Sequence, residues 1–205
     1  MSGFKLPALF EVSRNVSGPD SSLTQLLSVL FEHSSVLIST LEPQLTKSLS
    51  EAAPLSSYSE LIDKALELIG RWDISLQAQF ISGHPRIGET KNLSNLSAKE
   101  QGGRPGVNPT PPEVLTRLSH LNKCYEARYP GLRYITFVNG RSRQAIAEEI
   151  EDKLSFAHTL SPDTPPVGDI TGIDTESKEW IAELRRAIGD IGQIAKSRLV
   201  TLGME

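Results

Sequence analysis

The spacing of apolar residues is the feature that most constrains how this chain can fold. Between Tyr58 and Ile69 the apolar residues follow one another at intervals of 3, 1, 3, 1 and 3 positions, which places them on one face of a helix. Ser57 and Glu60 form a capping-box pattern at its start, and Gly70 stands at its end. The pattern predicts an amphipathic helix that buries one face against the rest of the chain.

The same periodicity recurs in four further segments. They are 21–41, 112–125, 145–154 and 174–202, the last being the longest. In the third, Glu149 and Lys153 have the i,i+4 spacing of a stabilising ion pair. Only Arg133–Val138 has the composition of a strand, and because one strand cannot form a sheet, we expect a buried extended segment there. The predicted fold class is therefore all-α, a single-domain helical bundle over residues 1–205.

Three stretches contain prolines and glycines that interrupt regular structure. They are Glu42–Ser56, Gly102–Pro112 and His158–Gly172. We expect irregular surface loops at all three. The second and third are long insertions, 102–112 and 158–172, in the one domain.

Composition excludes several classes of protein. The formal net charge is −4 and only 6% of the 205 residues are aromatic, which argues against a nucleic-acid partner. The single cysteine, Cys124, excludes a disulfide scaffold. No apolar run approaches the ~18 residues that cross a bilayer, so no membrane partner is expected. The N-terminus lacks a secretory pattern and Gly203-Met204-Glu205 is not a peroxisomal signal, so we predict a cytoplasmic location, with a peroxisomal one as the alternative.

Motifs for several common chemistries do not occur in the sequence. It contains no Walker loop, no GxGxxG and no GxSxG nucleophile elbow. The four histidines and the cysteine show neither HExxH nor paired CxxC spacing. We therefore expect no metal site.

His84 is the first candidate for chemistry, because it lies directly before Pro85 in ISGHPRIGET. Proline disfavours the α region for the residue before it, so we expect an extended or turn conformation. An imidazole held in this way can act as an acid or a base in a pocket. The alternative is a turn histidine that faces water.

The segment SAKEQ, Ser97–Gln101, is the second candidate. Ser97 and Glu100 fit a capping box, with Leu96 as the hydrophobic staple, which predicts a helix start at Ser97. The Gly102-Gly103 pair that follows makes any such helix short. Because free backbone N–H groups at a helix start can hold an anion, capping and ligand binding can coexist here.

Charged residues interrupt two apolar helix faces. Arg198 projects into the apolar arc of the last helix, where a guanidinium needs a carboxylate, a ligand or a route to solvent. The alternative to burial is snorkelling at the end of that helix. In FEHSS (Phe31–Ser35), Glu32 and His33 interrupt the first long helix, which indicates a solvated edge or a local helix break.

Together these segments resemble one known family. HPRIGE (His84–Glu89), SAKEQ and LNKCYEARYPGLRYITFVNGRS (Leu121–Ser142) occur in that order, with FEHSS upstream and SRL (Ser197–Leu199) near the end. The combination is similar to 2-oxo-4-hydroxy-4-carboxy-5-ureidoimidazoline (OHCU) decarboxylase over about Thr24–Leu202. That family completes the conversion of urate to (S)-allantoin in purine catabolism.

The resemblance implies an all-α homodimer that acts on a small ureidoimidazoline without metal or organic cofactor. By matching motif, the implied catalytic residues are His84, Glu100 and Arg198. The implied substrate-binding residues are Pro85, Ser97, Ala98, Lys99, Gln101, Tyr134, Ile135, Thr136, Phe137 and Val138. The implied reaction is decarboxylation of OHCU to (S)-allantoin. The alternatives are a helical interaction module without activity and a metal-dependent ureide hydrolase.

The chain departs from the family pattern in three places. Ser34-Ser35-Val36 stands where the family usually has SPW. Tyr129-Pro130 and Tyr134-Ile135 stand where it usually has Phe-Gly and Phe-Ile. The insertions at 102–112 and 158–172 are longer than in compact members.

Overall fold

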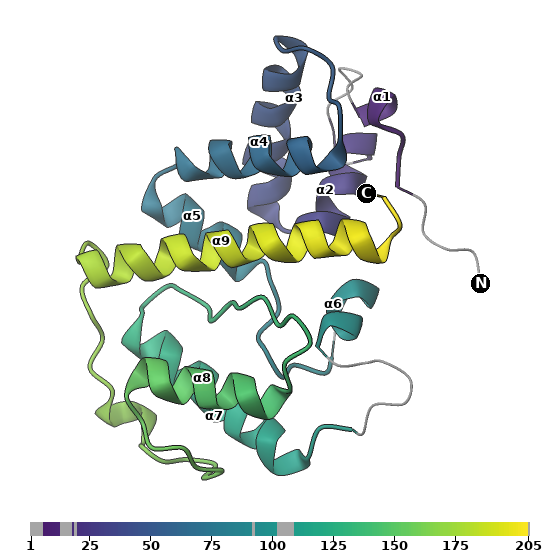
Figure 1. Cartoon of the computed structure of the whole chain (residues 1–205). Helices are drawn as coiled ribbons and strands as arrows, with labels where there is room; N and C mark the ends of the chain where they lie inside the picture. The colour runs from purple at the N-terminus through teal and green to yellow at the C-terminus, as the bar shows by residue number, and fades with distance from the viewer. Residues whose placement is uncertain (1–5, 13–17, 19, 92, 102–108, 205) are drawn as a thin grey trace. The chain divides into compact units, whose positions relative to one another are not determined.

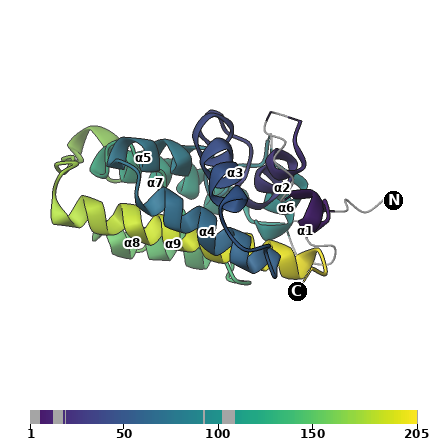
Figure 2. The same ribbon diagram turned by 90° about the horizontal axis from the view of Figure 1, so that it is seen from above.

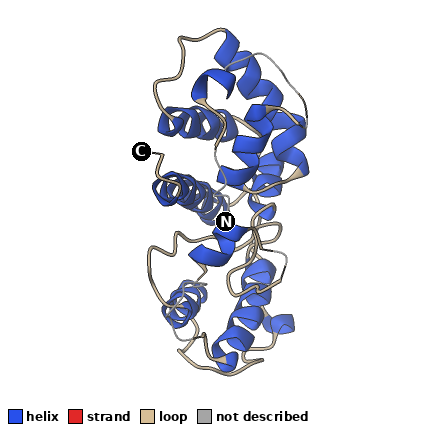
Figure 3. Ribbon diagram, turned by 90° about the vertical axis from the view of Figure 1, so that its right-hand side faces the viewer, coloured by secondary structure: helices blue, strands red, loops and turns tan. Residues whose placement is uncertain are grey.

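The computed structural model describes residues 6–12, 18, 20–91, 93–101 and 109–204. These residues form helices and connecting loops, and no strand occurs among them (Figure 3), so the all-α prediction is confirmed. They divide into two compact units, unit 1 (Met1–His84 with Ile188–Glu205) and unit 2 (Pro85–Ala187). The single domain over 1–205 stays a prediction.

Unit 1 contains the helices before His84 and the second part of the last helix. Their bounds are Leu9–Val12 (α1), Ser22–Phe31 (α2), Leu37–Leu41 (η1, a π-helical turn), Glu42–Ser50 (α3), Tyr58–Gly70 (α4), Ile74–Ser82 (α5) and Lys178–Thr201 (α9). α2 contacts α1, η1 and α3, and α4 contacts η1 and α3 (Figures 1 and 2). Together they bury an aliphatic core in which each fully buried Leu or Ile contributes roughly 1.5–3 kcal/mol.

The helix predicted after Ser57 is confirmed as α4. The Ser57 hydroxyl accepts the Glu60 N–H at 3.1 Å, whereas the Glu60 carboxylate accepts the Ser56 N–H at 2.8 Å. The α4 surface packs closely on α9, since a Cβ added at Gly192 would lie 2.6 Å from a methyl carbon of Leu66. Glycine at position 192 therefore lets the two helices approach.

The continuous helix predicted over 21–41 is wrong at one point. α2 ends at Phe31, because Glu32 has a φ of +62°, which a right-handed helix cannot contain. The local break indicated by FEHSS is therefore confirmed. Glu32 is buried and His33 is exposed, so the solvated-edge interpretation holds only for the histidine.

The loop predicted at Glu42–Ser56 is wrong over its first part, where α3 forms. Pro43 lies in the first turn of α3, where a missing N–H breaks no intrahelical bond. Leu41, Leu45 and Leu49 repeat at i,i+4 and are buried. Burial of this leucine row outweighs the proline signal.

The helix α5 lies in a segment for which the periodicity of the sequence predicts no element. Asp73 caps it by accepting the Leu76 N–H at 3.0 Å, and Phe80 and Ile81 are buried. Its end at Ser82 places Gly83 and His84 directly after the last turn.

Unit 2 contains the remaining elements and the first part of α9. They are Asn95–Glu100 (α6), Pro112–Arg128 (α7), Arg143–Leu154 (α8) and a 3-10 turn, Val167–Asp169 (η2). The helices predicted over 112–125, 145–154 and 174–202 are confirmed, with α9 beginning at Lys178. α7 packs against α8 (Figure 1).

The ion pair predicted between Glu149 and Lys153 is wrong. Glu149 pairs with Arg141, and Lys153 donates to Glu183 of α9 at 2.7 Å. Glu149 therefore links α8 to the loop before it, and Lys153 links α8 to α9. A pair between the two residues would lie within α8 alone.

The extended segment predicted at Arg133–Val138 is confirmed, with Tyr134, Ile135 and Thr136 buried. The predicted loop at 158–172 contains no helix apart from the short turn η2. Of the predicted loop at 102–112, residues 102–108 lie outside the described part of the chain, and the helix α7 already begins at Pro112.

Candidate functional site

The predicted site residues are shared between the two units. Unit 1 carries His84 and Arg198, and unit 2 carries Pro85, the residues 97–101 and the residues 134–138. Within each unit the surroundings of these side chains test the interpretations drawn from sequence.

His84 is buried in unit 1, with only 3% of its surface exposed, so the alternative of a turn histidine facing water is wrong. Its backbone N–H donates to the Ile81 carbonyl at 3.0 Å, and its ring meets the edge of Phe80 at a centroid distance of 5.6 Å. A Cβ at Gly83 would lie 2.8 Å from that of Ser34, so the turn before the histidine has room only for glycine. Packing from two sides therefore fixes the imidazole.

Arg198 is 1% exposed, so the snorkelling alternative is wrong as well. Its Nη2 donates to Glu32 Oε1 at 2.6 Å, and its Nη1 donates to the carbonyls of Val29 and Leu30 at 2.8 and 3.3 Å. Those carbonyls belong to the last turn of α2, which has no intrahelical donor for them. The break at Glu32 thus turns a carboxylate towards the guanidinium and compensates its charge inside unit 1.

The loop that begins with Pro85 is held by Gln101. The Gln101 side chain accepts the Gly88 N–H at 2.8 Å and donates to the Arg86 carbonyl at 3.2 Å. Asn122 of α7 adds a bond to the Ile87 carbonyl at 2.9 Å. The oxygen and the nitrogen of the Gln101 amide both form hydrogen bonds with this loop. In this structure the residue therefore positions the loop.

The helix start predicted at Ser97 is wrong by three residues. Ser94 caps α6 by accepting the Ser97 N–H at 3.1 Å, and Ser97 lies inside the helix with 2% of its surface exposed. The prediction that any helix here is short is confirmed, because α6 ends at Glu100. Ala98 is partly buried and Lys99 is exposed.

A network centred on Glu149 holds the segment 134–138. Its carboxylate accepts the Tyr134 hydroxyl at 2.5 Å and the Thr136 hydroxyl at 3.1 Å, and it pairs with Arg141. Arg141 in turn donates to the Phe137 carbonyl at 2.6 Å. Burial raises the pKa of Tyr134 to about 12, so the phenol stays a donor at neutral pH. Sequence reasoning missed Glu149 in this role because it assigned the side chain to Lys153.

The backbone of the segment 134–138 also accepts a hydrogen bond from α9 within unit 2. The Ile135 carbonyl accepts a bond from Arg186 of α9 at 2.8 Å, and the Arg186 guanidinium lies 5.3 Å from the centre of the Tyr134 ring. Since Tyr134, Ile135 and Thr136 are buried, Phe137 and Val138 are the less buried members of the predicted binding segment.

A cavity of about 410 Å³ in unit 2 brings several predicted site residues together. Lys99, Glu100, Gln101 and Val138 all line it. The other lining residues are Ile87, Pro109, Thr110, Pro111, Gly140, Arg141, Ser142, Arg143 and Gln144. Its size suits a small molecule. The predicted residues His84, Pro85, Ser97, Ala98, 134–137 and Arg198 are not among those that line it.

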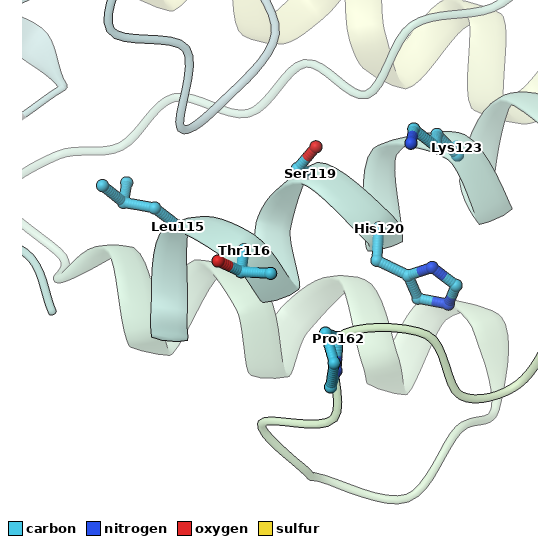
Figure 4. A pocket seen from close by; sticks show the side chains of 6 residues that line it. All are labelled: Leu115, Thr116, Ser119, His120, Lys123 and Pro162. Carbon is cyan, nitrogen blue, oxygen red and sulfur yellow. The ribbon is translucent and has the colours of Figure 1, made fainter. Parts of the chain in front are cut away.

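A second hollow of about 360 Å³ lies between α7 and the loop 158–172. Figure 4 shows Leu115, Thr116, Ser119, His120 and Lys123 along α7, with Pro162 on the loop. The His120 ring points towards that loop, and its Nε2 lies 2.9 Å from the Pro165 carbonyl. None of the predicted site residues lines this hollow.

The described residues offer neither a metal cluster nor a membrane-spanning helix. No group of three or more His, Cys, Asp or Glu side chains there is arranged to hold a metal ion. None of the helices that the structure describes combines the length and apolarity needed to span a membrane.

Comparison with known proteins decides the family. The family model described as OHCU decarboxylase matches residues 17–160. The chain belongs to the OHCU decarboxylase family. Its fold is similar to that of a solved structure, an OHCU decarboxylase in the presence of (S)-allantoin, with a TM-score of 0.53, 18% identity, and coverage of 87% of this chain and 97% of that one.

Curated relatives are longer proteins. The chain is 27% identical over 138 residues to the uric acid degradation bifunctional protein of Bacillus sp. (strain TB-90), which is 67% of this chain and 26% of the relative. It is 29% identical over 133 residues to the uric acid degradation bifunctional protein PucL of Bacillus subtilis (strain 168), 65% of this chain and 25% of the relative. The chain thus spans about a quarter of the length of these relatives.

Proposed function

We propose that the protein decarboxylates OHCU to (S)-allantoin, the last step in converting urate to allantoin, without a metal or organic cofactor. The observation that carries the proposal is a buried, rigidly packed His84 in a member of the OHCU decarboxylase family. A histidine of this kind suits proton transfer, because an unperturbed imidazole titrates near neutral pH.

The proposed chemistry needs no external electron sink. When the C–CO₂⁻ bond of the substrate breaks, its electron pair enters the adjacent ring C=N. The ring nitrogen takes up one proton, a second proton adds to the carbon that becomes the stereocentre, and the neighbouring hydroxyl loses its proton and becomes a carbonyl. The balance is one substrate anion and one proton giving one allantoin and one CO₂. Decarboxylases whose substrates lack such a sink need a cofactor such as pyridoxal phosphate or thiamine.

In this proposal the protein supplies position, charge and one proton. His84 moves the proton and Glu100 tunes or orients it. Arg198 compensates negative charge, and Gln101 with the backbone of 134–138 holds the ureide. Pro85, Ser97, Ala98 and Lys99 complete the binding surface. Preorganised donors of this sort are usually the largest contribution to an enzyme's rate.

The assembly and location are part of the proposal. We propose a homodimer, as the family resemblance implies, and a cytoplasmic location with a peroxisomal one as the alternative. Sedimentation of the purified chain distinguishes a dimer from a monomer, and fluorescent tagging in the source cells reports the compartment.

The test of function is a coupled assay in which fresh precursor is generated from urate and product handedness is followed by circular dichroism. Because the precursor is expected to decay by itself to racemic allantoin, only a one-handed signal counts as catalysis. We expect (S)-allantoin in the presence of the protein. A racemic product would contradict the proposal.

Two variants and one reagent separate the alternatives. His84→Asn should lower kcat by about 10²–10⁴-fold while the melting temperature changes little, because the loss is one of acid–base catalysis. His33→Asn, at an exposed histidine of the same unit, is the matched control and should keep full activity. An inactive module would show no turnover in any variant, and a metal-dependent hydrolase would lose turnover in excess chelator.

A further inference from the structure

Arg143, the first residue of α8, lines the 410 Å³ cavity beside Glu100 and Gln101. Its Nη1 donates to the neutral hydroxyl of Thr110 at 3.3 Å. Its Nε is buried and has no hydrogen-bond partner among the described residues. A guanidinium offers five N–H donors, so Arg143 has donors at the cavity wall beyond the one that Thr110 accepts.

Several other arginines of unit 2 are paired with glutamates. Arg117 pairs with Glu151, Arg141 with Glu149, and Arg86 with Glu126. No described carboxylate forms an ion pair with Arg143, and burial lowers its pKa without an opposing acidic neighbour.

Glu100 lines the same cavity but forms no ion pair with Arg143 among the described residues, and the residues that precede Pro109 add no acid. Residues 102–108, which precede the cavity wall at Pro109, contain no Asp or Glu. Because a desolvated charge is costly unless it is paired, the missing partner points to an anion that is not part of the chain.

We propose that Arg143 binds the carboxylate of the substrate in this cavity, an inference that rests on the proposed function and names the group by which the substrate is recognised. A guanidinium fits a carboxylate with two parallel N–H bonds. Arg198, the other cation assigned to charge compensation, forms an ion pair with Glu32, whereas Arg143 has no such carboxylate among the described residues.

This assignment has a kinetic consequence. The carboxylate leaves as CO₂, so Arg143 holds the anionic substrate and has no anion to hold in neutral allantoin. An interaction that is present in the ground state and weakens as the C–C bond breaks lowers KM and does not raise kcat. Arg143 therefore acts on substrate affinity and helps the enzyme to favour substrate over product.

The experiment compares Arg143→Met, Arg143→Lys and Arg185→Met in the coupled assay. Arg143→Met should raise KM roughly 10–100-fold, the loss expected for hydrogen bonds to a charged group, with kcat unchanged or raised. Arg143→Lys keeps the charge and should recover part of that loss. Arg185→Met removes an equal charge from an exposed site of α9 and should leave KM unchanged.

Melting temperatures of all three variants show whether each is folded, and Arg143→Lys preserves a readout if Arg143→Met is unstable. An unchanged KM in folded Arg143→Met, or an equal rise in Arg185→Met, would overturn the assignment. So would a fall in kcat at constant KM. Failure of the proposed function is a different result, namely a racemic product with the wild-type protein.

Discussion

Each unit buries an arginine against a glutamate, and the two pairs differ in what else the arginine holds. In unit 1 Arg198 lies 2.6 Å from Glu32, and in unit 2 Arg117 lies 2.7 Å from Glu151. The Nη1 of Arg198 donates to two carbonyls at the end of α2. The Nη1 of Arg117 instead donates to the carbonyls of Ser161 and Thr164 in the loop 158–172. Arg117 is wholly buried, and its Nη2 has no partner among the described residues.

The difference teaches that a buried ion pair does not by itself mark a functional site. Arg198 and Glu32 stand in SRL and FEHSS, the segments that resemble a decarboxylase, whereas Arg117 ties down a long insertion. The segments that accept the other hydrogen bonds of each arginine indicate its role. We therefore expect Arg117 to serve the stability of unit 2 and Arg198 to serve activity as well.

Replacing Arg117 tests the structural half of this comparison and has the largest expected effect. Arg117→Met leaves the Glu151 carboxylate buried without its cation and releases the loop carbonyls. The free energy of unfolding should fall by about 3–5 kcal/mol, as for other broken buried pairs. Urea denaturation followed by circular dichroism measures it. Activity per folded molecule should not change, and a loss of less than about 1 kcal/mol would show that the pair is not structural.

A third buried glutamate, Glu183, extends the comparison to a carboxylate held by two cations. Burial alone would raise its pKa, but Arg186 and Lys153, with the Tyr125 hydroxyl, outweigh burial and lower it from 4.5 to about 2. A lowered folded-state pKa adds stability above the unfolded value and loses it as the pH falls towards 2. The shift corresponds to about 3 kcal/mol of stability lost between about pH 4.5 and pH 2.

Denaturation midpoints at a series of pH values check this effect. Glu183→Gln should be less stable at pH 7 and should lack most of this acid-dependent loss. Glu148→Gln, at a half-buried position of α8 that makes no contact with Glu183, Arg186 or Lys153 in the hydrogen bonds described, is the control and should retain the wild-type pH profile. Equal slopes for wild type and Glu183→Gln would mean that the three partners do not hold the carboxylate charged.

The sequence predicted most of the helices because their apolar faces carry a strong local signal. The helix α4 and the pair α7 and α8 each bury residues at helical spacing, so periodicity alone finds them. The helix α3 was missed because Pro43 and Pro54 suggest a loop, although a proline in the first turn is harmless. α5 is short, and the N-cap residue Asp73 is its only clear sequence signal.

The site was predictable only in part, because local patterns do not show partners far away in the sequence. Arg198 was expected inside an apolar arc, but its partner Glu32 is 166 positions away. A capping box was expected at Ser97, yet Ser94 offers the same hydroxyl three residues earlier and leaves Ser97 buried. The unpaired state of Arg143 has no sequence signal, since it depends on which acids fail to reach it.

Conservative replacement of the two arginines tests the functional half of the comparison and has the smallest expected effect. A lysine keeps the positive charge but lacks the planar fork, so Arg198→Lys and Arg117→Lys each lose part of a similar hydrogen-bond set. We expect kcat/KM to fall about 10–100-fold in Arg198→Lys, equivalent to about 1.4–2.7 kcal/mol, and to stay within twofold in Arg117→Lys. The coupled assay measures both, and urea denaturation should report similar losses of stability. Because the two substitutions are chemically identical, a difference in activity at equal stability would mean that Arg198 takes part in catalysis or binding and that Arg117 does not. Equal activities in the two variants would remove the distinction between them.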